Sequence, residues 1–227
     1  MTLRTGIHRA AGRKPVTIYF LRHAHSQANN QGILAGRTKG IKLSTRGKRE
    51  AEGLVQTLGT LDFTEIYSSP LERCRETINP FCQSHPGIPI HLDEAFIEMN
   101  YGEWSGLKLA HLARKKMWAT IQSNPSSIRF PVGESFLEMS TRAIEGIEKI
   151  RTNGKNALVV SHGDVIRVIL NHYLGAHLDN FQRLSIDPAS ISRITFHGEK
   201  VNINTINMVP NISGTKDSTL GGGSGKK

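Results

Sequence analysis

The chain has 227 residues, of which 37% are hydrophobic and 21% are charged, the composition of an ordinary globular protein with its own core. Its apolar runs are too short to cross a bilayer and its N-terminus has no apolar secretory stretch, so the sequence predicts a cytoplasmic protein without a membrane partner. The net charge is +10, but +4 of it lies in residues 1–15 and +2 in residues 211–227, which argues against a nucleic-acid partner.

The same distribution divides the chain into three parts. We expect a basic N-terminal tail over residues 1–15, with a transit-like segment as the alternative, one folded domain over residues 16–210, and a flexible Gly/Ser/Lys-rich tail over residues 211–227. Cys74 and Cys82 fall in one helical segment and match no zinc spacing, so we expect reduced thiols and no metal site. The protein is expected to be a monomer or a homodimer.

The first half of the chain alternates apolar strand patterns with helical ones. In order, the sequence predicts a strand over 16–21, a loop over 27–42, a helix capped by Ser44, a strand over 65–68, a helix with Pro70 in its first turn that runs to about Cys82, and a strand over 88–92.

The second half begins with an irregular stretch over 98–106. There follow helices over 107–121 and 134–151, a strand over 157–160, a helix over 164–174 closed by Gly175, and a closing strand pair over 191–196 and 201–208. Such alternation predicts an α/β fold with a mostly parallel central sheet and helices on both faces, in which ligands bind at the carboxyl ends of the strands.

Two histidine-bearing segments stand at such strand ends. They are residues 20–26, which contain His23, and residues 159–164, which contain His162. Histidine is the side chain most readily used for group transfer near neutral pH. Arg22 directly precedes His23, and a guanidinium fork matches the oxygens of a phosphate group. The sequence therefore predicts a phosphate site with His23 as its natural nucleophile.

Four segments together resemble the histidine phosphatase superfamily, which is the phosphoglycerate mutase-like family. Residues 21–26 with Asn29 resemble its Arg-His-Gly signature, and residues 68–77 its second arginine segment. Residues 97–106 resemble its acid-bearing segment, and residues 161–163 its second histidine segment. The four occur in the family's order, although Ala24 stands where the signature has glycine. The likeness extends over most of residues 16–208 to an actinobacterial branch described as phosphomutases, and it implies a three-layer α/β/α fold.

The physical roles of these residues follow from phosphoryl transfer. His23 must be neutral to attack, and two nearby arginines, Arg22 and Arg73, disfavour its charged form while they bind the phosphate oxygens. The other ring nitrogen of His23 should donate to a backbone carbonyl. His162 is expected to donate to the transferring group. The resemblance assigns the proton donor to Glu98, with Glu103 as its competitor.

Four further residues are candidates for binding substrate, and they are Ser26, Asn29, Arg37 and Gly163. Arg37 is equally compatible with a solvated residue, and His25 either lines the pocket or caps the loop. Trp104 is expected to pack in the core. Residues 133–135 are expected to open the long helix, with the pocket rim as the alternative. Because guanidinium and imidazole groups supply the counter-charge, neither a metal nor a cofactor is expected.

Three functions compete. The favoured one is a metal-independent phosphomonoester hydrolase that acts on a small phosphorylated metabolite. The glycolytic mutases of the family carry arginine after the acid and asparagine after the second His-Gly pair, whereas this chain has Met99 and Asp164. Both differences favour a hydrolase over the first alternative, a phosphomutase that uses the same phosphohistidine. The second alternative is a protein that binds phosphorylated ligands without catalysis.

Overall fold

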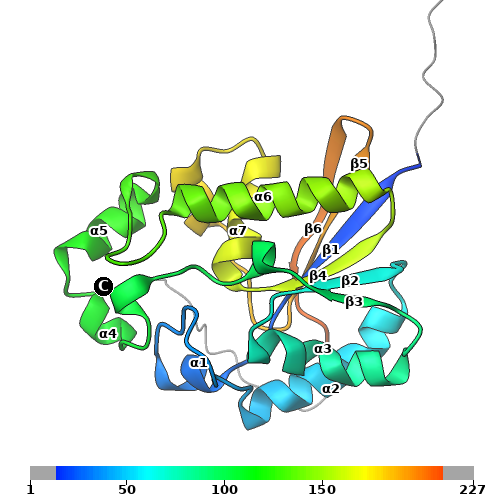
Figure 1. The fold of residues 1–227 in the computed structure, drawn as a ribbon, viewed down its shortest axis with the longest axis horizontal. Coiled ribbons are helices and arrows are strands. Elements are labelled where there is room, and N and C mark those ends of the chain that lie inside the picture. Colours follow the sequence, from blue (N-terminus) through cyan, green and yellow to red (C-terminus); the bar gives the residue numbers. More distant parts are fainter. Residues whose placement is uncertain (1–13, 212–227) are drawn as a thin grey trace, which may run out of the picture.

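Six strands form one sheet between two layers of helices in the computed structural model, which describes residues 14–211 (Figure 1). Apart from residues 14, 15 and 211, the two predicted tails lie outside the described residues. Within the described range, no helix is both long and apolar enough to cross a membrane.

The sheet has the strand order β3-β2-β4-β1-β5-β6. Its strands are β1 (Val16–Arg22), β2 (Glu65–Ser68), β3 (Ile90–Leu92), β4 (Ala157–Ser161), β5 (Ile191–His197) and β6 (Lys200–Met208). The four strands from β3 to β1 are parallel, whereas β5 pairs antiparallel with both β1 and β6. The predicted mostly parallel sheet with a closing strand pair is therefore confirmed.

Helices cover both faces of the sheet. On one side lie α2 (Thr45–Gly59) and α3 (Glu72–Ser84), and on the other lie α6 (Phe136–Asn153) and α7 (Gly163–Tyr173) (Figure 1). Because side chains alternate along a strand, β1 contributes to two cores. Its residues Ile18 and Phe20 pack with α6 and α7, whereas Tyr19 and Leu21 pack with α2 and α3.

The remaining elements are short and belong to the connections. They are α1 (Gln27–Gln31), α4 (Leu109–Leu112), α5 (Lys116–Ser123) and the 3-10 turns Glu94–Phe96, Gly102–Trp104, Pro125–Ser127 and Leu178–Arg183. The segment around α4 is joined to the one after α1, because Leu34 donates its N–H to the carbonyl of Leu107 and Leu109 donates its N–H to that of Gly32.

Three predictions about elements were wrong. The predicted loop over 27–42 begins with α1, whose capping box between Ser26 and Asn29 has a recognisable spacing. Pro70 lies before α3, which starts at Glu72, and not in its first turn. The single helix predicted over 107–121 is two helices, α4 and α5, separated by residues 113–115. Residues 106–109 also pair with residues 32–34, and α4 begins only at Leu109.

Candidate active site

The parallel strands bring the two predicted histidines together. His23 follows β1 and His162 follows β4, and these two strands are hydrogen-bonded neighbours. The N–H of His23 donates to the carbonyl oxygen of Ser161 at 2.9 Å. The two rings lie edge to face with their centroids 5.2 Å apart, and both side chains are buried. The juxtaposition that the sequence predicted is present.

One ring nitrogen of His23 is hydrogen-bonded, and the other has no partner among residues 14–211. Its Nδ1 lies 2.8 Å from the carbonyl oxygen of Ala24, which can only accept, so Nδ1 carries the proton. Burial, followed by the charges of Arg73 and Arg22, holds the pKa of His23 well below its ordinary value. The ring is therefore neutral, and Nε2 carries a lone pair. Both expectations about this residue are confirmed.

Two arginines bring unsatisfied donors into the same place. Arg73 is buried, and its Nη2 donates to the carbonyl oxygen of Gly36 at 2.9 Å. Its Nε and Nη1, together with Nε of Arg22, are buried without a hydrogen-bond partner in residues 14–211. A buried donor without an acceptor is costly, so these N–H groups are suited to an anionic ligand.

His162 is oriented by neighbours on both sides of its ring. Its Nδ1 accepts from Nη2 of Arg73 at 3.1 Å, so its proton lies on Nε2, which donates to Oγ of Ser69 at 2.7 Å. Burial and the charge of Arg73 lower the pKa of His162 well below its ordinary value. Its Nδ1 faces Arg73 and Glu98, so the nitrogen turned toward the charged groups is an acceptor in this structure.

Glu98 is the acid that the fold places here. Its Oε2 lies 3.7 Å from Nδ1 of His162, and only 12% of its side chain is exposed. Burial, assisted by the carboxylate of Asp164, raises the pKa of Glu98 to about 7, although Arg73 opposes the shift. Such a carboxyl can hold a proton near neutral pH and also release it. Glu103, the competitor, is exposed.

Gly163 lies against the Arg22 guanidinium, which occupies the space that a larger side chain at residue 163 would need. A Cβ added at Gly163 would lie 3.3 Å from both Cζ and Nε of the Arg22 guanidinium. Arg22 is held from the other side, because its Nη1 donates to the carbonyl oxygen of Ile186 at 2.5 Å. Gly163 therefore leaves room for the guanidinium rather than offering a group of its own.

The three other predicted substrate-binding residues are engaged in the protein. Ser26 caps α1 and donates its hydroxyl to Oδ1 of Asn29, while Nδ2 of the Asn29 side chain makes no hydrogen bond within the described residues. Arg37 donates to the carbonyl oxygen of Glu98 and to the carboxylate of Glu134. Contact of these residues with substrate stays a prediction. His25 caps the loop, since its Nδ1 donates to Oγ of Ser44, which in turn donates to the carbonyl of His25.

Several residues near the site make contacts that the sequence did not predict. Ser69 orients His162, and Asp164 accepts from the Tyr101 hydroxyl at 2.6 Å. Glu134 and Arg142 hold the backbone of the Glu98 segment. Ser69 follows a strand end as the histidines do, and the sequence pointed to Asp164 and Glu134 without indicating these contacts. Trp104 packs on Phe130 in the core, as expected.

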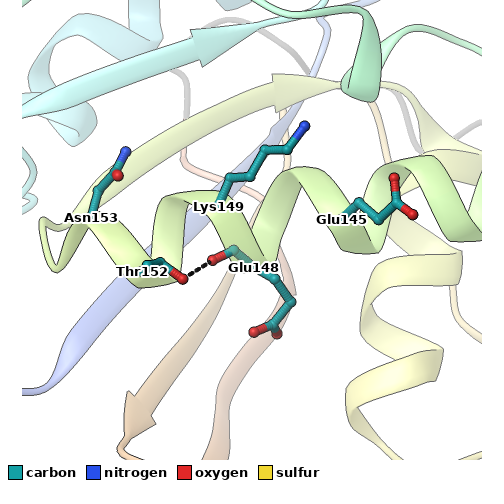
Figure 2. Close-up of a pocket in the computed structure, with 5 residues that line it drawn as sticks. All are labelled: Glu145, Glu148, Lys149, Thr152 and Asn153. Carbon is teal, nitrogen blue, oxygen red and sulfur yellow. Dashed lines mark hydrogen bonds between the residues drawn. The ribbon is translucent and has the colours of Figure 1, made fainter.

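Two further features of the described residues were compared with this site: possible metal-binding clusters and a surface hollow. The described residues contain no group of three or more His, Cys, Asp or Glu side chains placed to hold a metal ion. A shallow hollow lies on α6, and Figure 2 shows that its lining comes from that one helix, including Glu148 and Thr152, whose hydrogen bond is internal to the helix. None of the predicted site residues lines it.

Comparison with known sequences agrees with this geometry. The family model for the histidine phosphatase superfamily (branch 1) matches residues 18–209. Phosphoserine phosphatase 1 of Hydrogenobacter thermophilus is 30% identical over 189 residues, which cover 79% of this chain and 86% of that protein. The 2,3-bisphosphoglycerate-dependent phosphoglycerate mutase 2 of Gloeobacter violaceus is 31% identical over 161 residues, which cover 67% of this chain and 73% of the relative.

Solved structures share the fold. Bacillus stearothermophilus YhfR superposes with a TM-score of 0.80 at 24% identity, over 87% of this chain and 99% of that one. The alpha-ribazole phosphatase from Shigella flexneri has a TM-score of 0.75 at 23% identity, over 86% and 98% of the two chains. The three-layer α/β architecture is therefore the one found in these proteins.

Proposed function

The chain belongs to the histidine phosphatase superfamily (branch 1), and we propose that it hydrolyses phosphomonoesters through a phosphohistidine formed on His23. Phosphatase and mutase relatives alike make it an enzyme of phosphoryl transfer. The observation that carries the proposal is the free Nε2 of the neutral His23 ring beside unpartnered guanidinium donors.

In the first step, the lone pair on Nε2 of His23 attacks the phosphorus atom. The bond between phosphorus and the leaving oxygen breaks, and Glu98 gives its proton to that oxygen. Arg22 and Arg73 bind the phosphoryl oxygens, and the charge of Arg73 acts strongly because its side chain is buried. The products are an alcohol and a phosphohistidine.

In the second step, the same groups act in reverse. Water attacks phosphorus while the Glu98 carboxylate takes a proton from it, the bond to Nε2 breaks, and inorganic phosphate leaves with His23 neutral again. A carboxyl group with a pKa of about 7 suits both directions, since it is half protonated near neutral pH.

Metal independence is part of the proposal. The guanidinium groups of Arg22 and Arg73 supply the counter-charge and donors that a divalent ion would otherwise bring. The neutral ring of His162 helps to orient Arg73, because its Nδ1 accepts from that guanidinium. No cofactor is required by this sequence of steps.

Two residues near Glu98 favour a hydrolase over a mutase. Met99, which follows Glu98, is fully buried in the core and cannot present a charge to substrate. Asp164 places a carboxylate near Glu98, and a highly anionic bisphosphate would be opposed by it. The mutase remains the second candidate because one relative at 31% identity is a phosphoglycerate mutase. The non-catalytic binder is less favoured, since the acid, both arginines and both histidines lie close together beside the ends of β1 and β4.

The substrate class that fits is a small phosphorylated metabolite. A cytoplasmic location and a monomeric or homodimeric state complete the proposal. The phosphoserine phosphatase relative makes phosphoserine the first compound to assay.

The test compares the wild-type protein with His23→Ala in p-nitrophenyl phosphate and EDTA. His197→Ala, at an exposed residue at the end of β5, is the matched control. We expect the control to keep its turnover in EDTA and His23→Ala to lose it. Equal turnover by all three proteins, or turnover only with added divalent metal, would contradict the mechanism. Isomerisation of a phosphoglycerate that depends on a bisphosphate primer would favour the mutase.

A further inference from the structure

Glu134 lies between the 3-10 turn at residues 125–127 and α6 and takes no part in the mechanism above, yet its carboxylate is among the most heavily bonded in the described chain. Only 14% of its side chain is exposed. Its Oε1 accepts from Nη2 of Arg142 at 2.8 Å, from Nη2 of Arg37 at 3.0 Å and from the backbone N–H of Asn100 at 2.8 Å. Its Oε2 accepts from Nε of Arg142 at 3.2 Å.

The same two arginines also hold the main chain of the proton donor. Nε of Arg37 donates to the carbonyl oxygen of Glu98 at 2.9 Å, and Nη2 of Arg142 donates to that oxygen at 3.2 Å. Arg37 comes from the loop after α1 and Arg142 comes from α6, so the Glu98 carbonyl accepts hydrogen bonds from two separate segments. Glu134 is the anion that both guanidiniums share.

A second set of contacts ties Glu134 to the residues after Glu98. The N–H of Glu134 donates to the carbonyl oxygen of Asn100 at 3.0 Å, which makes the bonding between the two residues reciprocal. The preceding Gly133 approaches so closely that an added Cβ would lie 2.4 Å from that same oxygen. The two segments therefore lie backbone to backbone.

The charge balance explains why one carboxylate matters. Burial alone would raise the pKa of Glu134, but its bonds with Arg142, Asn100 and Arg37 lower it, so the group is ionised. Without that charge, two guanidiniums would face one carbonyl and repel each other. The Glu98 carboxyl must meet the leaving oxygen at hydrogen-bond distance, so a small displacement of its backbone is costly.

From these contacts we propose that Glu134 is a positioning residue, which holds the Glu98 carboxyl in place for proton transfer to the leaving group through Arg37 and Arg142. The inference rests on the proposed function, because it gives Glu134 a role only if Glu98 is the proton donor. It differs from a purely stabilising ion pair, which would affect all substrates alike.

The test uses two substrates that need the proton donor to different degrees. p-Nitrophenolate leaves readily as an anion, whereas the alkoxide of glycerol 2-phosphate must be protonated as it leaves. The value of kcat/KM reports the steps up to the first irreversible one. It is measured for the wild type, Glu134→Gln, Glu98→Gln and the double variant, with circular dichroism to verify folding. Glu148→Gln is the control, because Glu148 lies on α6 and pairs with Arg151.

We expect Glu134→Gln to lower kcat/KM for glycerol 2-phosphate about 10- to 100-fold, a part of what a full acid catalyst supplies, and for p-nitrophenyl phosphate less than about threefold. In the Glu98→Gln background, adding Glu134→Gln should lower kcat/KM little further, since both residues act on the same proton transfer. If Glu134→Gln does not fold, Arg37→Gln, at a partly exposed residue, should give the same substrate dependence. Glu148→Gln should leave both substrates unaffected.

Two results would overturn the inference, and they are distinguishable from failure of the proposed function. An equal loss on both substrates, or additive losses in the double variant, would make Glu134 merely structural while Glu98 keeps its role. If Glu98→Gln instead lowers kcat/KM equally for both substrates, Glu98 is not the proton donor. The role proposed for Glu134 then fails together with that part of the proposed function.

Discussion

Nδ1 of His23 lies 2.8 Å from the carbonyl oxygen of Ala24, the next residue along the chain, and this contact determines which ring nitrogen is free. Ala24 is itself held in place, because its N–H donates to Oγ1 of Thr77 at 2.9 Å. Its methyl group is fully buried in the core between β1, α2 and α3, which accounts for an alanine where the family signature has glycine.

Thr77 is therefore expected to support the nucleophile from α3. Thr77→Val keeps the shape but leaves the Ala24 N–H without its acceptor, which should cost about 1–3 kcal/mol of unfolding free energy and lower kcat. Urea unfolding and turnover of p-nitrophenyl phosphate measure the two effects. Thr141→Val, on the exposed side of α6, is the control and should change neither. Unchanged stability and turnover in Thr77→Val would show that the Ala24 contact is not needed.

A substitution of Gly163 should affect substrate binding only through the position of the Arg22 guanidinium. Gly163→Ala places a Cβ 3.3 Å from the guanidinium and should displace it, raising KM about tenfold, the equivalent of losing one charge-assisted contact. The backbone of Gly163 is helical, so the fold should persist. Gly59→Ala, where an added Cβ would meet only Nε2 of His85 at 3.9 Å, is the matched control. A KM for Gly163→Ala equal to that of the control would count against phosphate binding by Arg22.

The raised pKa of Glu98 predicts that kcat/KM declines on the basic side of its pH profile. A carboxyl with its pKa raised to about 7 is protonated below that pH, so kcat/KM for an alkyl phosphate should hold below pH 7 and fall above it. The pKa of His23 is lowered well below its ordinary value, so His23 should add no limb near neutrality. Glu98→Gln should lack the basic limb. If that variant retains the limb at the same pH, Glu98 is not the titrating acid.

The same raised pKa predicts an effect on stability. The folded state binds the Glu98 proton more tightly than the unfolded chain does, so this contribution is complete below pH 4.5 and is lost as the pH rises through about 7. Glu98→Gln should therefore gain stability over the wild type between pH 5 and pH 8, by on the order of 2 kcal/mol. Urea unfolding at both pH values tests this, with Glu148→Gln as control. A difference between variant and wild type that is independent of pH would refute it.

The sequence predicted the fold and the chemical core of the site because both depend on local patterns. His23 and His162 each follow an apolar strand, and parallel strands bring their ends to one edge. The helix starts at Ser44 and at residues 133–135 were also predicted from neighbouring residues, and the side chains of Ser44 and Ser135 cap these helices. Glu98 was assigned by resemblance, and its burial beside His162 then supplied a physical reason.

What the sequence could not predict depends on contacts between distant segments. Arg37 was a candidate for substrate contact or for solvation, and neither alternative indicates its bonds to the Glu98 carbonyl and to the carboxylate of Glu134, some hundred residues further along the chain. Nothing in the pattern around residue 37 indicates that partner. The pairing of residues 106–109 with residues 32–34, which precedes the start of α4 at Leu109, is likewise a contact between distant segments.

The most direct test of the account is capture of the covalent intermediate. The protein is mixed with p-nitrophenyl phosphate, quenched under alkaline conditions that preserve phosphohistidine, digested and analysed by mass spectrometry. We predict one phosphoryl group on His23, present in the wild type and in His197→Ala and absent in His23→Ala. Active enzyme that carries no phosphoryl group at His23 under rapid quenching, or carries it at another residue, would contradict the central claim.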